Sequence, residues 1–173
     1  HKSKSAWLED IDNSIDLDIL RSQVKFENLF PIERKRYPLI GAIACGKPIT
    51  ANEEIELYIE AGAEIDADFC LRAEGDSMTG ARIYDGDIIF IRKQSMVDNG
   101  EIAAVIIDDE ATLKRVNYYP DKNLLILKAE NPKYEDLVYT GEQLDHIIIL
   151  GKAVAFQSDI RWKKGGGGRI MKE

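Results

Sequence analysis

The sequence predicts a mainly β domain of short twisted strands, preceded by an N-terminal linker or arm. From Leu39 onward, short apolar runs alternate with turn residues, which is typical of many short strands. The 173 residues suit one domain with an arm, and the hydrophobic fraction of 45% is enough for a core. We therefore expect a linker or arm over residues 1–38, the domain over 39–162 and a flexible tail over 163–173.

Alternation of side chains and turn dipeptides place the individual strands. Residues Asp68–Ala73 alternate apolar and polar side chains, as in a half-buried strand, and Glu53–Glu60 fits either a strand or a short helix. Turns are expected at Asp85–Asp87, Asn99–Gly100 and Asp108–Glu110. The remaining expected strands are Leu39–Ala44, Ile88–Ile91, Ile102–Ile107, Ala111–Val116, Leu124–Leu127, Ile147–Leu150 and Val154–Phe156.

The two ends of the chain differ in texture from the domain. Ile11, Ile15 and Ile19 fit one helical face, but part of the same segment alternates as a strand does, and both alternatives stay open. The basic stretch Arg34–Arg36 is expected to be a solvated linker. Because the run Gly165–Gly168 is costly to order, we expect the tail to be a flexible linker or an artificial addition. The chain lacks an initiating Met, which predicts a fragment or a processed product.

Composition argues against several classes of protein. The net charge is -8 and no long basic run is present, so the chain itself is not expected to bind DNA. Two cysteines, Cys45 and Cys70, and two histidines are too few for a zinc cluster or a disulfide framework, which predicts a reducing compartment. No apolar run is long enough to cross a membrane, and no signal peptide is visible. We therefore expect a cytoplasmic protein with no metal and no cofactor.

One short segment has the features of a nucleophile. In Gly75–Met78, a small residue lets the backbone turn sharply before Ser77 and presents its hydroxyl beside nearby backbone amides. A serine hydroxyl is a weak nucleophile and needs an adjacent base. Neither His1 nor His146 lies in a recognisable triad pattern. The base must therefore come from another residue type.

Lys114 is the candidate base, provided that desolvation keeps its amine neutral. It lies in an expected strand, where it shares a face with Thr112 and Val116. Leu113 and Arg115 point to the opposite face. Taken separately, a lysine in a strand and a Gly-x-Ser turn are both common surface features, so their combination carries the argument.

Several separated motifs agree in order and spacing. Ser77 and Lys114 are 37 positions apart (114 − 77). The motifs are Gly75–Met78, Tyr84–Ile88, Asn99–Ala103, Thr112–Arg115, Ala129–Pro132 and Ile149–Val154. Together they resemble the C-terminal peptidase domain of LexA, UmuD and the self-cleaving phage repressors. The resemblance covers about Leu39 to Trp162 and implies a LexA-like fold.

The resemblance implies a self-cleaving serine peptidase. Ser77 is then the nucleophile, Lys114 the base, and the backbone amides of Asp76 and Ser77 hold the oxyanion. The family cuts itself at an Ala-Gly or Cys-Gly bond upstream of the serine. Here the segment Ala44, Cys45, Gly46 stands 32 positions before Ser77 (77 − 45), and Gly46 allows a close approach of the backbone.

The resemblance also implies a role as the C-terminal domain of a phage-type or LexA-type transcriptional repressor. Such a repressor dimerises, is cleaved under stimulation by the RecA filament, and binds operator DNA through a helix-turn-helix domain. Residues 1–36 are too few to contain that domain. We expect a homodimer paired through an exposed edge strand near Ile147–Phe156.

Three other functions compete with the repressor. A UmuD-like accessory subunit of a translesion DNA polymerase also uses a Cys-Gly bond, but the arm here is longer than such a subunit needs. A leader-peptide-processing enzyme with the same chemistry would need a membrane anchor. A non-catalytic binding module would leave Ser77 and Lys114 as ordinary surface residues.

Overall fold

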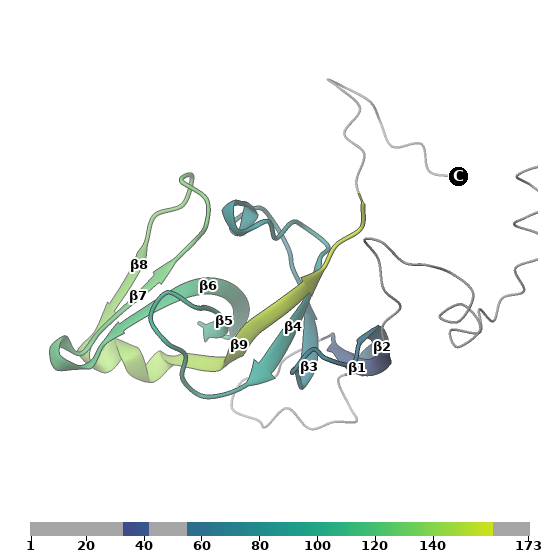
Figure 1. Ribbon diagram of the computed structural model, residues 1–173. Helices are drawn as coiled ribbons and strands as arrows, with labels where there is room; N and C mark the ends of the chain where they lie inside the picture. Colours follow the sequence, from purple (N-terminus) through teal and green to yellow (C-terminus); the bar gives the residue numbers. More distant parts are fainter. Residues whose placement is uncertain (1–32, 42–54, 161–173) are drawn as a thin grey trace, which may run out of the picture. The chain divides into compact units, whose positions relative to one another are not determined.

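The computed structural model describes residues 33–41 and 55–160, which form one nine-stranded sheet (Figure 1). The strand order is β2-β1-β3-β4-β9-β5-β6-β7-β8. The strands are β1 (Arg34–Ile40), β2 (Ile55–Gly62), β3 (Phe69–Arg72), β4 (Ile88–Lys93), β5 (Ile102–Ile107), β6 (Glu110–Tyr119), β7 (Leu124–Lys128), β8 (Leu137–Thr140) and β9 (Ile147–Gln157). Short 3-10 turns lie at η1 (Thr79–Ala81), η2 (Pro120–Lys122) and η3 (Gly141–His146). The prediction of a mainly β domain is confirmed.

The last strand, β9, lies in the middle of the sheet and joins its two halves. Strands β1 and β3 run parallel, with Leu39 opposite Cys70, and the chain then continues through antiparallel pairs. The first half of β9 pairs with β5, and its second half pairs with β4. In Figure 1, β9 accordingly crosses between the group β5 to β8 and the group β1 to β4.

The two strands expected at Ile147–Leu150 and Val154–Phe156 are one continuous strand, β9. Gly151 lies between them, and it marks a close approach of two backbones rather than a turn. A Cβ atom added at Gly151 would lie 2.2 Å from the carbonyl oxygen of Arg92 and 2.7 Å from Cγ2 of Ile91. Glycine inside a strand has this meaning when a neighbouring chain passes too close for any side chain.

Other boundaries also differ from those expected from the sequence. β1 begins at Arg34, so the basic stretch Arg34–Arg36 is the exposed first half of a strand and not a linker. The segment Glu53–Glu60, which fitted a strand or a helix, contributes to strand β2. β8 was not expected from the sequence, and its short apolar run Leu137–Tyr139 is largely exposed. Residues 42–44, the segment Ile11–Ile19 and the tail lie outside the described residues.

The core consists of three clusters along the sheet. Beneath β1, β3 and β4, the fully buried Tyr37 meets Phe90 edge to face, with ring centroids 5.1 Å apart. The Tyr37 hydroxyl donates to the carbonyl oxygens of Gly62 at 2.7 Å and Ile65 at 2.8 Å, so it is buried with its polar end satisfied. A second cluster includes Met78 and Ile83, and a third lies around β5, β6 and β7. The second cluster contains Phe69 before Ser77 and Met78 after it, so it anchors the chain on both sides of the serine.

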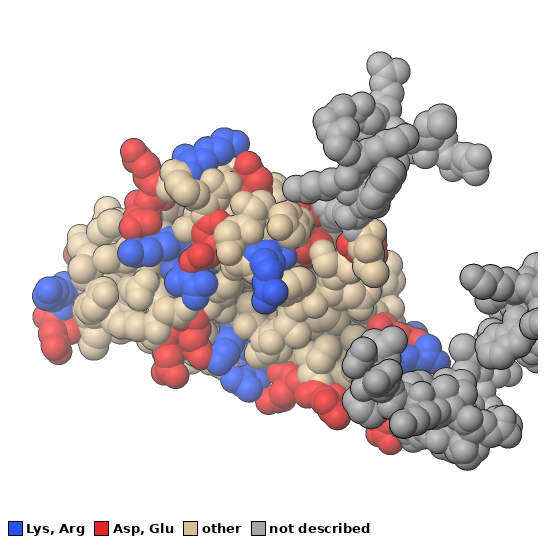
Figure 2. Space-filling view, turned by 45° about the horizontal axis from the view of Figure 1, so that its top comes forward, with Lys and Arg blue, Asp and Glu red and all other residues tan. Residues whose placement is uncertain are grey.

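The surface carries both signs of charge. In Figure 2, Lys and Arg side chains are interspersed with Asp and Glu side chains over the face in view. This mixture differs from the basic stripe that marks a nucleic-acid-binding face. Among the described residues, no helix is long and apolar enough to cross a membrane.

Candidate active site

Ser77 lies in the loop between β3 and η1, and the local sequence determines the shape of this loop. Gly75 has a φ of +79°, in the left-handed region that favours glycine, and its N–H donates to Oδ1 of Asp85 at 2.9 Å. Directly after the serine, Met78 is 4% exposed and packs into the second core cluster. The serine is therefore held between a tight turn and a buried anchor, and its own side chain is half-buried.

Ser77 lines a cleft of about 550 Å³. Across the cleft lie the first residues of β6, including Thr112 and Leu113. Gly41, at the end of the described segment 33–41, also lines it, as does Glu56 at the start of the next described segment. Ala44, Cys45 and Gly46 lie outside the described residues. The two described segments that flank residues 42–54 therefore both contribute to the lining of this cleft.

Lys114 is half-buried on β6, opposite Ala103 of β5. Its ammonium donates to Oγ1 of Thr112 and to the carbonyl oxygen of Leu113, both at 3.1 Å. Burial lowers the pKa of Lys114 below its ordinary value of 10.5, because desolvation disfavours the charged form. Since Thr112 lines the same cleft as Ser77, a single side chain connects the lysine with the serine's surroundings.

The prediction about the two faces of this strand is confirmed. Lys114 bonds to Thr112 on its own face, and Val116, two positions on, is fully buried in the cluster around β5 to β7. Leu113 packs on the other side, against the cluster that contains Met78. Thr112 and Leu113 nevertheless both line the cleft, whereas Lys114 is not among the described residues that line it and is connected to it through its bond to Thr112.

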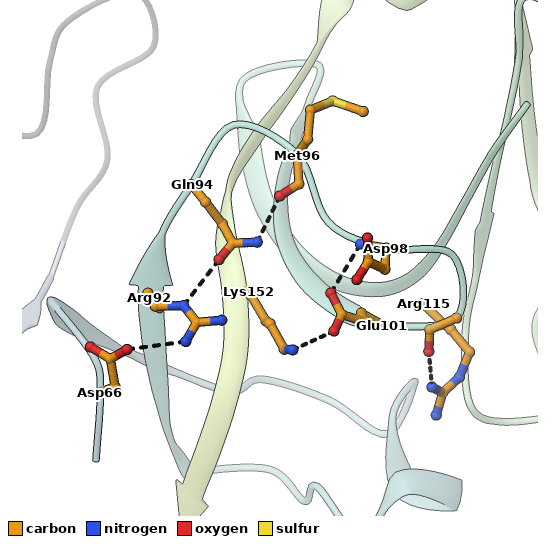
Figure 3. A network of polar contacts seen from close by, with 9 residues as sticks. Asp66, Arg92, Gln94, Met96, Asp98, Glu101, Arg115 and Lys152 are labelled. Atoms are coloured by element: carbon orange, nitrogen blue, oxygen red, sulfur yellow. Dashed lines mark hydrogen bonds and ion pairs between the residues drawn. The ribbon is translucent and has the colours of Figure 1, made fainter. Parts of the chain in front are cut away.

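A second lysine on the same sheet has a very different environment. Lys152 of β9 lies opposite Ala103 from the other side, and its ammonium pairs with the Glu101 carboxylate (Figure 3). The hydrogen bond from Lys152 holds the pKa of Glu101 below its usual range. Within the described residues, the partners of Lys114 are by contrast an uncharged hydroxyl and a carbonyl. An amine that no carboxylate stabilises as an ammonium is the better candidate for a neutral base.

The loop of residues 129–134, which follows β7, contacts the loop between β3 and η1 that carries Ser77. We call residues 129–134 the shelf and the loop that carries Ser77 the serine loop. The Asn131 side-chain amide donates to the carbonyl oxygen of Asp76 at 2.8 Å. Lys133 and Tyr134 both bond the Asp76 carboxylate, and these bonds hold its pKa below its usual range. The Gly80 N–H donates to the carbonyl oxygen of Glu130 at 2.6 Å. The contacts made by Asn131 were not anticipated from the sequence.

Arg115 ties the shelf to the strand that carries Lys114. Its guanidinium pairs with the Glu130 carboxylate and also donates to the carbonyl oxygen of Gly100. A half-buried guanidinium with two fixed acceptors makes a rigid cross-link between neighbouring elements. The base strand, the shelf and the serine loop are therefore mechanically connected.

Other reactive side chains of the described region are less suited to catalysis. Cys70 is fully buried, and burial raises the pKa of its thiol to about 12, so the thiolate that attacks a carbonyl does not form. His146 is exposed at the end of η3. In the described part of the chain, no cluster of three or more His, Cys, Asp or Glu side chains is placed to hold a metal ion.

The structure defines a mainly β domain with a half-buried serine in a cleft, and comparison with known proteins shows its family. Residues 38–154 match the model of the Peptidase S24-like family, and the chain belongs to this family. The resemblance inferred from the motifs is thereby confirmed.

The most informative relatives are LexA repressors. The LexA repressor of Brevibacillus brevis is 36% identical over 142 residues, which cover 80% of this chain and 65% of that protein. That of Desulfitobacterium hafniense is 41% identical over 120 residues, covering 68% of this chain and 55% of that protein. That of Leptospira interrogans is 39% identical over 155 residues, covering 87% and 72%. The chain thus spans only part of the length of the relatives it matches.

Proposed function

We propose that this chain is the C-terminal part of a LexA-like transcriptional repressor, and that it cleaves its own backbone with Ser77 and Lys114. The observation that carries the proposal is the environment of the Lys114 amine. It is half-buried, its pKa is lowered by burial, and its bonds go to uncharged oxygens, one of them on a side chain of the Ser77 cleft. A lysine that loses its proton easily, and that is bonded to a side chain of the cleft that holds Ser77, is suited to general-base catalysis once its amine reaches the serine hydroxyl.

In the proposed reaction, the neutral Lys114 amine takes the proton of the Ser77 hydroxyl while Oγ attacks the carbonyl carbon of Cys45. The backbone amides of Asp76 and Ser77 stabilise the oxyanion. Lys114 then returns the proton to the Gly46 nitrogen as the peptide bond breaks and an ester to Ser77 remains. Lys114 then takes a proton from water, which attacks the ester carbonyl, and returns that proton to Oγ of Ser77 as the ester bond breaks and the carboxyl group of Cys45 is freed.

The flanks of the cleft support Cys45–Gly46 as the bond that is cut. Gly41 lines the cleft, and four residues of extended chain reach at most about 14 Å from it to Cys45. The substrate is therefore tethered to the site, and an intramolecular reaction gains much of its rate from proximity. A RecA filament would then act as coprotease by favouring the conformation in which the segment occupies the cleft.

The repressor role rests on the relatives, which carry the name LexA repressor. They also favour a repressor over a polymerase subunit. We propose that operator DNA is bound through a separate helix-turn-helix domain, because the net charge of the chain is -8 and the face seen in Figure 2 is of mixed charge. The proposed setting is the cytoplasm, where RecA and the operator are found, and no cofactor takes part in the reaction.

A homodimer is part of the proposal, and β9 offers an edge for it. Residues Ala153–Gln157 pair with β4 on one side, whereas β5 pairs with β9 only up to Lys152. Within the described residues, the other edge of Ala153–Gln157 has no strand partner. Antiparallel pairing of two such edges about a twofold axis would cover both, and the partly exposed Phe156 lies on this stretch.

Incubation of the purified chain over a series of pH values tests the proposed dyad, with the products identified by mass spectrometry. Cleavage between Cys45 and Gly46 should accelerate with rising pH, at a lower pH than an ordinary lysine would require. Ser77→Ala should abolish cleavage at every pH. Lys114→Arg should lose about 10²- to 10⁴-fold in rate, since arginine stays protonated and cannot act as a base.

The matched control is Lys122→Arg, the same change at an exposed position in η2 outside the cleft. It should cleave as the parent does. A folded parent that stays intact at about pH 10 would refute self-cleavage. A Lys114→Arg variant as fast as the parent would remove Lys114 from the role of base.

A further inference from the structure

The shelf holds the peptide unit that precedes the nucleophile. The Asp76 carbonyl and the Ser77 N–H belong to the same planar group. That carbonyl accepts the Asn131 side-chain amide at 2.8 Å and the Thr79 hydroxyl at 3.2 Å. Its oxygen is therefore fixed in position by one donor from the shelf and one from η1.

The direction of this carbonyl also fixes the direction of the Ser77 N–H. All described peptide bonds are trans, and in a trans unit the C=O and the N–H point in opposite directions. The Ser77 N–H consequently points away from Asn131. Among the described residues, none accepts a hydrogen bond from it. A fixed N–H donor without a partner beside a nucleophile is what an oxyanion requires.

Asn131 is itself immobilised. Its side-chain Oδ1 accepts the Lys133 N–H at 3.0 Å, and its carbonyl oxygen accepts the Tyr134 N–H at 3.1 Å. Pro132 follows directly and restricts the backbone of Asn131. The Asn131 side chain is thus oriented by a turn of its own before it bonds to Asp76.

We propose that Asn131 is a positioning residue for self-cleavage, which aims and polarises the Ser77 N–H through the Asp76 carbonyl. This role rests on the proposed function of Ser77. A hydrogen bond to the carbonyl of a peptide unit withdraws electron density from its N–H and strengthens that N–H as a donor. The contribution of Asn131 is accordingly made when the oxyanion forms, and it leaves the protonation of Lys114 unchanged.

Two substitutions remove the donor and keep the turn. Asn131→Asp retains an oxygen for the Lys133 N–H but has no amide to offer Asp76. Asn131→Ser also retains an acceptor, is too short to reach the Asp76 carbonyl, and adds no charge. The control is Asn99→Asp, because Asn99 uses the same two groups in another turn: its amide donates to the Tyr118 carbonyl at 3.1 Å, and its Oδ1 accepts the Tyr118 N–H at 2.7 Å.

The experiment measures the rate of self-cleavage against pH for the full chain and each variant, together with thermal melts. Asn131→Ser should lower the maximum rate about tenfold, the factor expected for one hydrogen bond gained in the transition state. Its pH midpoint should match that of the parent. Asn99→Asp should cleave at the parent rate, even if it melts at a lower temperature.

A second readout does not depend on cleavage. The ¹⁵N resonance of Ser77, recorded on the folded chain, should move in both Asn131 variants and stay in place in Asn99→Asp. If the parent cleaves and both Asn131 variants equal it, the role of Asn131 is overturned and the proposed function stands. If the Ser77 resonance stays in place in both variants, the peptide unit is not held by Asn131 and the proposal also fails. If a folded parent does not cleave at any pH, the proposed function itself is overturned, and the role of Asn131 fails with it.

Discussion

A single methyl group at Gly80 should separate the serine loop from the shelf. A Cβ atom built on Gly80 lies 2.5 Å from the carbonyl oxygen of Glu130, a backbone atom, whereas ordinary contact begins at 3.4 Å. Relief of this clash requires the shelf to retreat by about 0.9 Å. The hydrogen bond from the Gly80 N–H to that oxygen, now 2.6 Å, would lengthen to about 3.5 Å, beyond a normal bond. The bond between Asn131 and Asp76 would be stretched by the same movement.

Two lost hydrogen bonds cost about 2 kcal/mol, and the smaller conformational entropy of alanine in the unfolded chain offsets about 0.5–1 kcal/mol of that. Gly80→Ala should therefore destabilise the domain by about 1–1.5 kcal/mol, or about 5 °C in Tm. Self-cleavage should slow about tenfold at every pH. The control is Gly141→Ala, where φ is +58° but no atom lies within 4 Å of the new Cβ, so strain arises without movement of the shelf. Gly80→Ala with the parent's Tm and the parent's cleavage rate would refute this account of the contact.

Two further predictions concern Lys114 and β9. Burial lowers the folded-state pKa of Lys114, so between that pKa and 10.5 the unfolded chain binds more protons and stability rises with pH. In a Ser77→Ala background, Lys114→Met should be at least as stable as its parent at pH 7, and urea titrations should show this advantage shrinking towards pH 10.5; an advantage that grows instead would contradict the sign. Phe156→Asp should convert the dimer to a monomer in sedimentation equilibrium at micromolar concentration, whereas the same change at exposed Val138 of β8 should not. A parent that is monomeric throughout would count against the dimer.

The local sequence was sufficient to predict those strands that are marked by an apolar run or by alternating side chains between turn residues. β5 has the predicted bounds, and the alternation in Asp68–Ala73 identified β3. The pairing of Thr112 with Lys114 also followed from local alternation. β5 is buried on both faces, and an unbroken apolar run between turns identified it, whereas the alternation along β6 reflects two faces that meet different surroundings.

Features set by distant parts of the chain could not be predicted in this way. Gly151 reads as a break, and only the passage of β4 shows that the strand continues through it. The bond between Asn131 and Asp76 joins residues 55 positions apart, and an asparagine before a proline is first of all a turn signal. A sequence therefore suggests which residues carry chemistry more readily than it suggests which residues hold them in place.

The position of β1 has a consequence for what cleavage would release. A cut between Cys45 and Gly46 would place β1 on one fragment and β2 on the other, although β1 lies between β2 and β3 in the sheet. Tyr37 and Leu39 of β1 are 1% and 0% exposed, so the nicked molecule would remain one folded body made of two chains. Cleavage of the peptide bond and dissociation of the two fragments would then be separate events. The rate of dissociation would be set by how slowly the buried strand β1 leaves the sheet. Denaturing gels would record only the cleavage, and the loss of repression would follow the dissociation.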